Sequence, residues 1–327
     1  MINKKVLIIG AGQIGSRHLQ GTLRIKYPLD IFVFDPIKSS LETAKERAAE
    51  IESNCHKVYF MNDMTSIPNS IDLAIIATTS NVRESVVRTL IETVHLKYLI
   101  LEKILFQSPS AYNEIPALLA EKKIKTWVNL PMRTYEHFRE FKAILAQLNE
   151  RMSFCVVGSN WRIGCNAIHY VDLFEYLCGS SLNQLNADWL DTELIPSKRG
   201  GFVEFSGTIK GIAKNKSTLM INSFPGEFGD VTIYISTPSH RFIIQEGNNC
   251  IIHHLEKESG FNTASKNYSP VYQSTLTGDY LTDIFDSGNC NLSKLDEIAN
   301  THKLYIEEFL TFYNTTNMSA SVLCPIT

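Results

Sequence analysis

Residues 6–21, VLIIGAGQIGSRHLQG, contain the feature that most restricts what this chain can fold into. A short apolar run leads directly into a G-x-G-x-x-G turn, and a helical pattern follows over residues 14–26. In such a turn the first glycine permits a tight bend, the second lets the backbone approach a pyrophosphate, and the third allows close helix packing. The start of the helix adds free N–H groups and a partial positive charge. We therefore expect a dinucleotide-binding loop with contacts from Gly10, Gly12, Gln13, Ile14 and Gly15.

The first 128 residues alternate short apolar segments with helical patterns. The expected strands cover residues 5–9, 31–34, 58–61, 73–77, 98–101 and 126–128. The expected helices cover residues 14–26, 39–52, 82–93 and 110–122. Strands that are apolar on both faces and alternate with helices predict a parallel sheet covered on both sides. The fold class is therefore α/β, with an N-terminal Rossmann domain built on a doubly wound parallel sheet.

Asp35 ends the second expected strand, about 20 residues beyond the glycine turn, where a carboxylate can accept the ribose hydroxyls of an adenosine. A 2'-phosphate at this place would meet its negative charge. The predicted cofactor is therefore NAD, with NADP disfavoured. In the alternative interpretation, Asp35 only starts a turn before Pro36.

The pattern changes after Pro131. Helices are expected over residues 135–148, 167–178 and 292–313, together with a strand in SFCVVGSNW and a strand-rich region over residues 190–254. A chain of 327 residues exceeds the size at which one core usually stops growing. We therefore expect a dinucleotide-binding domain at 1–128 and an α+β domain at 129–327 with an open, largely antiparallel sheet.

Composition excludes several classes of protein. A net charge of −3 provides no basic excess for a nucleic-acid backbone, and no segment approaches the roughly 20 apolar residues of a membrane span. The 7 cysteines are scattered and never form a CxxC pair. We expect reduced thiols, no metal site and a cytoplasmic location.

Four segments in order, GAGQIGSRH, DLAIIATTSNVR, LILEKIL and NAIHYVDLFEYLCG, resemble the glucose-fructose oxidoreductase/inositol dehydrogenase family, Gfo/Idh/MocA. The resemblance spans essentially the whole chain. It implies hydride transfer between a nicotinamide and a sugar-like hydroxyl or carbonyl, and assembly into homodimers or homotetramers through the C-terminal sheet. At lower specificity, the chain resembles members associated with surface-polysaccharide sugars, which suggests a nucleotide-linked or acidic sugar such as a nonulosonate.

The resemblance also implies roles for single residues. Lys103, with Glu102 beside it, is similar to the active-site lysine of the family, and His169 is similar to the catalytic histidine. An imidazole suits acid–base catalysis, and an ammonium group would stabilise a developing alkoxide. Cofactor contacts are expected from Glu102 and Lys103 as well, and from a loop after the fourth strand, at Thr78, Thr79 and Ser80.

Candidate substrate-binding residues are Arg133, Trp161, Asn166 and Asp172. Arg133 could bind a carboxylate or phosphate with both arms of its guanidinium, or form a salt bridge at the domain junction. Asp172 lies three residues after the predicted catalytic histidine and could orient it or pair elsewhere. Trp161 could line the substrate or simply pack.

Several positions depart from the family pattern. Cys165 stands where many members carry an aspartate, Ile104 replaces the customary proline, and Thr79 and Arg83 stand where proline and histidine are frequent. Two alternatives therefore stay open. The chain could be a non-catalytic or regulatory NAD-binding protein, or it could reduce an unsaturated or imine-like substrate with His169 acting only in binding.

Overall fold

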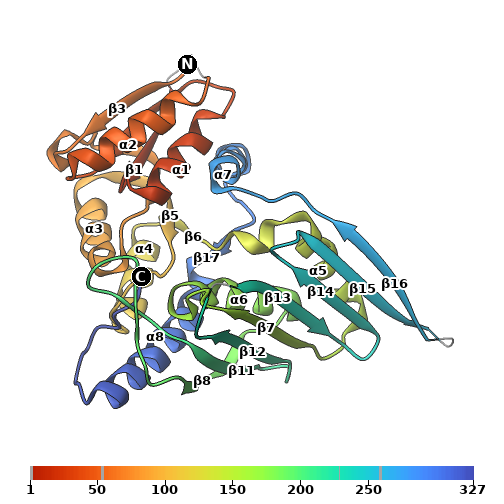
Figure 1. The fold of residues 1–327 in the computed structure, drawn as a ribbon. Helices are drawn as coiled ribbons and strands as arrows, with labels where there is room; N and C mark the ends of the chain where they lie inside the picture. The colour runs from red at the N-terminus through yellow and green to blue at the C-terminus, as the bar shows by residue number, and fades with distance from the viewer. Residues whose placement is uncertain (1–2, 53–54, 228, 258–259) are drawn as a thin grey trace. The chain divides into compact units, whose positions relative to one another are not determined.

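Six strands from the first 130 residues and a short strand at Ser293–Lys294 form a seven-stranded sheet in the order β17-β6-β5-β4-β1-β2-β3 (Figure 1). The computed structural model describes residues 3–52, 55–227, 229–257 and 260–327. The strands are β1 (Lys4–Ile9), β2 (Leu29–Phe34), β3 (Lys57–Met61), β4 (Ser70–Ile76), β5 (His95–Glu102), β6 (Lys125–Asn129) and β17 (Ser293–Lys294). β1 to β6 are parallel, and only β17 is antiparallel.

The sheet belongs to the first of two compact units, formed by Met1–Phe106, Ser110–Pro131 and Val271–Ala299. Its helices are α1 (Gln13–Leu23), α2 (Lys38–Ala49), α3 (Ser80–Thr93), α4 (Ala111–Glu121), α7 (Gln273–Ser287) and the short η1 (Met64–Ser66). Because helices cover both faces, the centres of β1, β2, β4, β5 and β6 are buried, whereas the edge strand β3 is partly exposed. The predicted Rossmann fold is confirmed.

The first unit also contains a segment from far along the chain. The expected boundary between 128 and 129 assigns Val271–Ala299 to the second domain, whereas these residues pack in the first unit. α7 crosses α1 at two glycines, where a Cβ on Gly278 would lie 2.7 Å from the carbonyl oxygen of Gly21. The backbones approach this closely only because both positions lack a side chain.

The second unit comprises Gln107–Pro109, Met132–Pro270 and Asn300–Thr327. Its eight-stranded sheet has the order β16-β15-β14-β13-β7-β12-β11-β8. The strands are β7 (Ser153–Ser159), β8 (Leu182–Leu190), β11 (Gly207–Ala213), β12 (Thr218–Phe224), β13 (Gly229–Ser236), β14 (His240–Gln245), β15 (Cys250–Lys257) and β16 (Gly260–Asn267). Only the β7–β12 pair is parallel, so the sheet is largely antiparallel, as expected.

One face of this second sheet is buried and the other is open. On β12, Leu219 and Ile221 are almost fully buried, whereas Met220 and Phe224 are 43% and 53% exposed. This alternation is typical of an antiparallel sheet covered on one side. The remaining elements are η2 (Pro131–Thr134), α5 (Glu136–Leu148), α6 (Ile163–Cys178), α8 (Leu295–Asn317) and the short hairpin strands β9 (Ile195–Pro196) and β10 (Val203–Glu204).

The largest differences from the sequence-based expectation concern two helices. α6 begins at Ile163 instead of residue 167, which brings Cys165 and Asn166 into its first turn. α7 was not expected as a separate helix.

Candidate functional site

The three glycines of the first turn have distinct surroundings. Gly10 has φ +93°, and a Cβ on it would lie 2.9 Å from the carbonyl carbon of Ala77. A Cβ on Gly15 would lie 1.7 Å from the carbonyl oxygen of Gly10, so helix α1 packs directly against the turn. Gly12 differs, because nothing lies within 4 Å of the position that its Cβ would occupy. The open space lies beside the N-terminus of α1, as a pyrophosphate requires.

Two further predicted contacts, Gln13 and Ile14, are the first residues of α1. Gly12 is the N-cap residue of α1 and has no side chain to accept a hydrogen bond from the N–H groups of the first turn. Arg47 of α2 donates to the carbonyl oxygen and to Oε1 of Gln13, at 3.1 and 2.5 Å, and so brings a cation to the first turn. Arg47 was not identified from the sequence, because no local motif indicates which residue of α2 reaches the turn.

Asp35 joins the glycine turn to the end of β2. It is 7% exposed, and its two carboxylate oxygens accept the N–H groups of Ala11 and Ile37, both at 2.8 Å. A carboxylate offers about four lone-pair sites. Asp35 therefore has the turn-forming role of the alternative interpretation and retains capacity for ribose hydroxyls.

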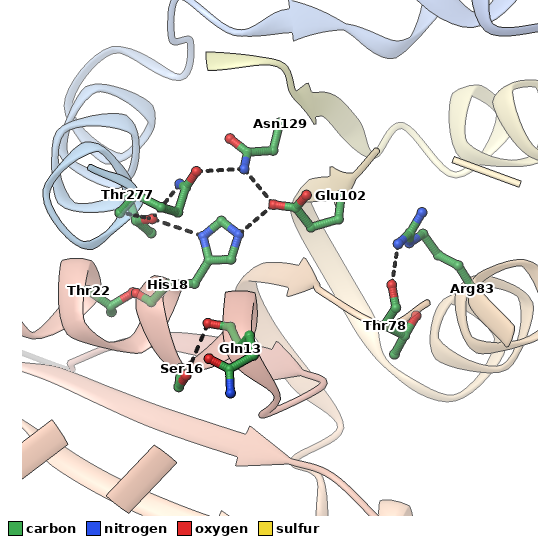
Figure 2. A network of polar contacts seen from close by, with 10 residues as sticks. Gln13, Ser16, His18, Thr22, Thr78, Arg83, Glu102, Asn129 and Thr277 are labelled. Atoms are coloured by element: carbon green, nitrogen blue, oxygen red, sulfur yellow. Dashed lines mark hydrogen bonds and ion pairs between the residues drawn. The ribbon is translucent and has the colours of Figure 1, made fainter. Parts of the chain in front are cut away.

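Arg83 connects the loops after β4 and β5. The side chain is 2% exposed and donates to the carbonyl oxygens of Thr78, Ile104 and Leu105, the first of which is drawn in Figure 2. The predicted cofactor loop therefore lies next to the segment that follows Lys103. Thr79 is the N-cap of α3 and Ser80 its first residue. Arg83 stands where histidine is frequent in the family, and its buried guanidinium links the loop after β4 to the loop after β5.

Glu102 is the centre of a buried polar network drawn in Figure 2. Its Oε1 lies 2.9 Å from Nε2 of His18 and accepts a hydrogen bond from Asn129. Nδ1 of His18 lies 2.9 Å from the hydroxyl of Thr277, and Asn129 also donates to Gln273 at 2.8 Å. The network therefore joins the ends of β5 and β6 to α1 and α7.

Electrostatics keep Glu102 ionised. Burial alone would raise the pKa of Glu102, but the hydrogen bond and charge of His18, with smaller contributions from Asn129 and Lys103, lower it to about 2. Glu102 was predicted to contact the cofactor, and its partners in the structure are protein side chains. Lys103 follows it, half-buried, at the carboxyl edge of the parallel sheet, where α/β folds bind ligands.

The predicted substrate residues of the second unit are held by protein groups. Nδ2 of Asn166 donates to the carbonyl oxygen of Trp161 at 2.7 Å. Trp161 is 4% exposed, and its indole N–H donates to the carbonyl oxygen of Asn222 at 2.9 Å. Trp161 therefore has a packing role. His169 lies on α6, one turn after Asn166, and is partly exposed.

Arg133 and Asp172 bind each other. Nε and Nη2 of Arg133 donate to the two oxygens of Asp172, at 3.1 and 2.7 Å. Asp172 is fully buried, and the guanidinium carbon also lies 5.0 Å from the ring centroid of Tyr176. The salt bridge considered as an alternative is therefore present.

The start of α6 has a carboxylate from another element. Oε2 of Glu204, in β10, accepts the backbone N–H of Cys165 at 3.1 Å. Glu204 is 2% exposed. Glu204 could not be identified from the sequence, because no local pattern pairs β10 with α6.

The described residues contain no group of three His, Cys, Asp or Glu side chains that could hold a metal ion. Within the same residues, every helix is too short or too polar to cross a bilayer.

The glycine turn, Asp35 and the parallel sheet define a dinucleotide-binding Rossmann protein. Residues 4–130 match the family model GFO_IDH_MocA, described as an oxidoreductase family with an NAD-binding Rossmann fold. The match confirms the resemblance to the Gfo/Idh/MocA family over residues 4–130. No curated protein matches the chain.

Solved structures extend the likeness to the whole fold. A super-repressor mutant of Gal80p from Saccharomyces cerevisiae has a TM-score of 0.74 at 13% identity, covering 98% of this chain and 100% of its own. A scyllo-inositol dehydrogenase from Lactobacillus casei, with NAD(H) and scyllo-inositol, has a TM-score of 0.69 at 12% identity, with 96% and 98% covered. UDP-N-acetylglucosamine 3-dehydrogenase from Acidithiobacillus ferrooxidans has a TM-score of 0.69 at 12% identity, with 95% and 96% covered. At these identities the likeness shows the fold.

Proposed function

We propose that this protein is an NAD-dependent dehydrogenase or reductase that transfers a hydride between nicotinamide and a hydroxyl or carbonyl of a sugar or sugar derivative. The observation that carries the proposal is the carboxyl edge of the parallel sheet. That edge carries the open glycine turn, the carboxylate of Asp35 and the half-buried Lys103. Two dehydrogenases with similar folds are named for their substrates, which are a polyol and a nucleotide-linked sugar.

The bound dinucleotide would supply the hydride acceptor or donor. The residues of the chain would handle the proton. His169 is the acid–base group, because an imidazole titrates near neutral pH. Lys103 stabilises negative charge on the reacting oxygen. Glu102, held by His18 and Asn129, fixes the end of β5 from which Lys103 projects.

Asp35 favours NAD over NADP in this proposal. Its carboxylate is held by two backbone N–H groups, so it cannot swing away from a 2'-phosphate without losing both hydrogen bonds. Calorimetric titration with NAD and NADP tests this assignment. Tighter binding of NADP to the wild-type protein would refute it.

The experiment that tests the function uses purified protein, NAD and a panel of sugars and nucleotide sugars, with turnover followed at the absorbance of the reduced nicotinamide. We expect Lys103→Met and His169→Ala each to lower turnover by several orders of magnitude while NAD affinity stays near that of the wild type. Turnover that is unchanged in both variants would remove these residues from the chemistry.

A regulatory NAD-binding protein is the second candidate function. It is favoured by Cys165, which leaves the first turn of α6 without the aspartate that many family members carry, and by the fold shared with Gal80p. NAD binding without turnover on any substrate of the panel would support this candidate against the first.

Assembly and location complete the proposal. The open face of the second sheet exposes large apolar side chains from three strands, namely Trp189, Met220, Phe224 and Tyr234. An apolar face of this kind suits a second copy of the chain, so we expect a cytoplasmic homodimer or homotetramer formed through this sheet. Light scattering after gel filtration tests the oligomer, and Met220→Lys should convert it to monomers.

A further inference from the structure

A carboxyl group and several phenols gather at one edge of the second sheet. Gln245 at the end of β14 pairs with Cys250 at the start of β15, and Cys250 pairs with Asn267 at the end of β16. The residues that follow the two strand ends, Glu246 and Tyr268, therefore lie at the same edge. Neither residue belongs to a motif that the sequence shows.

α6 contributes a third member of this cluster. The hydroxyl of Tyr170 donates to Oε2 of Glu246 at 2.9 Å. The ring of Tyr170 is almost completely buried and meets Trp161 edge to face, with centroids 5.3 Å apart. Tyr170 directly follows His169 in the sequence, so the carboxyl group is tied to the helix that carries the proposed acid–base residue.

Tyr135, the N-cap residue of α5, is the fourth member of the cluster. The rings of Tyr135 and Tyr268 both contact His137, with centroids 6.0 and 4.5 Å from its ring. Burial first, and the charge of Glu246 second, raise the pKa of each phenol to about 12. Both phenols therefore remain protonated and present O–H groups and ring faces.

Part of this cluster is open to solvent. Glu246, Tyr135 and Tyr268 are half-buried, while Tyr170 is buried beneath them. Burial raises the pKa of Glu246, and the hydrogen bond from Tyr170 only partly opposes this. Among the described residues, the side chain of Glu246 has a hydrogen bond only with Tyr170, through Oε2. Its second oxygen, Oε1, therefore accepts no hydrogen bond from these residues and can accept one from a ligand.

We propose, resting on the function proposed above, that Glu246 with Tyr135, Tyr170 and Tyr268 forms the sugar-binding subsite, which takes a neutral or amino sugar ring and rejects an acidic one. Oε1 of Glu246 accepts a ring hydroxyl or ammonium group, the rings of Tyr135 and Tyr268 cover the apolar C–H face of the sugar, and the buried Tyr170 holds Glu246 through Oε2. A carboxylate on the sugar would lie close to the carboxyl group of Glu246, and like charges repel strongly in a half-buried site. Of the two sugar types suggested by the sequence, the acidic type is therefore disfavoured, whereas a nucleotide-linked neutral or amino sugar fits.

The test measures binding directly, without turnover. Glucose, galactose and mannose, their 2-amino-2-deoxy derivatives and their uronic acids are titrated into the full-length protein saturated with NAD, with saturation-transfer NMR as the readout. In at least one of the three series, the neutral or amino sugar should bind about tenfold or more tightly than the uronic acid. Equal affinity for the uronic acid, or no binding by any sugar, overturns the proposal.

Variants assign the discrimination to Glu246. Glu246→Gln has the same shape and should bring the neutral sugar and the uronic acid to within about threefold of each other. Tyr170→Phe keeps the buried ring but removes the hydrogen bond, and should lower the affinity for the neutral sugar. Glu193→Gln changes an exposed glutamate of the same unit and should behave as the wild type. Discrimination that survives in Glu246→Gln overturns the proposal.

Failure of the subsite can be distinguished from failure of the dehydrogenase function. Selective, Glu246-dependent sugar binding without hydride transfer refutes the dehydrogenase but leaves the subsite intact. Turnover of an acidic sugar, unaffected by Glu246→Gln, refutes the subsite but leaves the dehydrogenase intact.

Discussion

Replacing Glu102 by glutamine tests the buried network of the first unit. Glu102 is 6% exposed, and its surroundings lower its pKa from 4.5 to about 2. A difference of this size corresponds to about 3 kcal/mol of stability. Because the pKa in the folded state is lower than in the unfolded chain, this stability is fully present above pH 4.5 and is lost as the pH falls toward 2.

Glu102→Gln should therefore lower the free energy of unfolding at pH 7 by about 3 kcal/mol, which is roughly 6–12 °C in the melting temperature of a unit of this size. Calorimetric melting between pH 7 and pH 3 is the assay. The difference between wild type and variant should shrink below pH 4.5, to about half at pH 3. His18→Gln should also destabilise, and the double variant should cost less than the sum of the two single variants.

Glu114→Gln is the matched control in the same unit. Glu114 pairs with Arg88 at 2.5 Å, but its side chain is 54% exposed, so the loss should stay below about 1 kcal/mol. If Glu102→Gln costs no more than this control, or if its effect does not change with pH, the reasoning about the buried charge is refuted.

Three further predictions address the loop, a buried histidine and the ion pair. Gly12→Ala should keep the melting temperature of the wild type but weaken NAD binding at least about tenfold in calorimetric titration, because the new Cβ would fill the open space beside α1. Gly15→Ala should fail to give folded protein, since a Cβ at this position would lie 1.7 Å from a backbone oxygen. Burial lowers the pKa of His137 to about 4, so wild-type stability should fall as the pH drops from 6.5 to 4; this fall should be smaller in urea unfolding of His137→Phe, where the lowered pKa values of His56 and His253 remain. Asp172→Asn should cost about 3–5 kcal/mol in urea unfolding at pH 7, because the guanidinium of Arg133 loses a fully buried partner; a cost below about 1 kcal/mol would contradict this.

The sequence predicted the parallel sheet because its signals are local. Each parallel strand of the sheet contains a short apolar run, and the glycine turn fixes the start of α1. The start of α6 was placed too late because it depends on a distant group. Gly164 and Cys165 are weak helix formers, and the carboxylate that receives the N–H of Cys165 comes from Glu204 in β10.

The same distinction holds for the candidate site. The position of Glu102 and Lys103 at the end of β5 could be predicted, because the apolar run before them is visible in the sequence. Their roles in the site came from the family resemblance and stay predictions. The partners of Glu102 could not be predicted completely, since His18 and Thr277 are 259 positions apart and meet only when α7 packs on α1. For Arg133, the sequence left open a substrate anion or an internal partner, and the structure supplies Asp172.

The return of the chain to its first unit has a consequence for biosynthesis. α7 follows almost the whole second unit in the sequence, yet it supplies Gln273 and Thr277 to the centre of the first. During translation the first unit therefore cannot complete its fold until α7 has been synthesised and has left the ribosome. Separate expression of residues 1–130 should leave His18 and Asn129 without these partners and the α7-facing side of α1 uncovered.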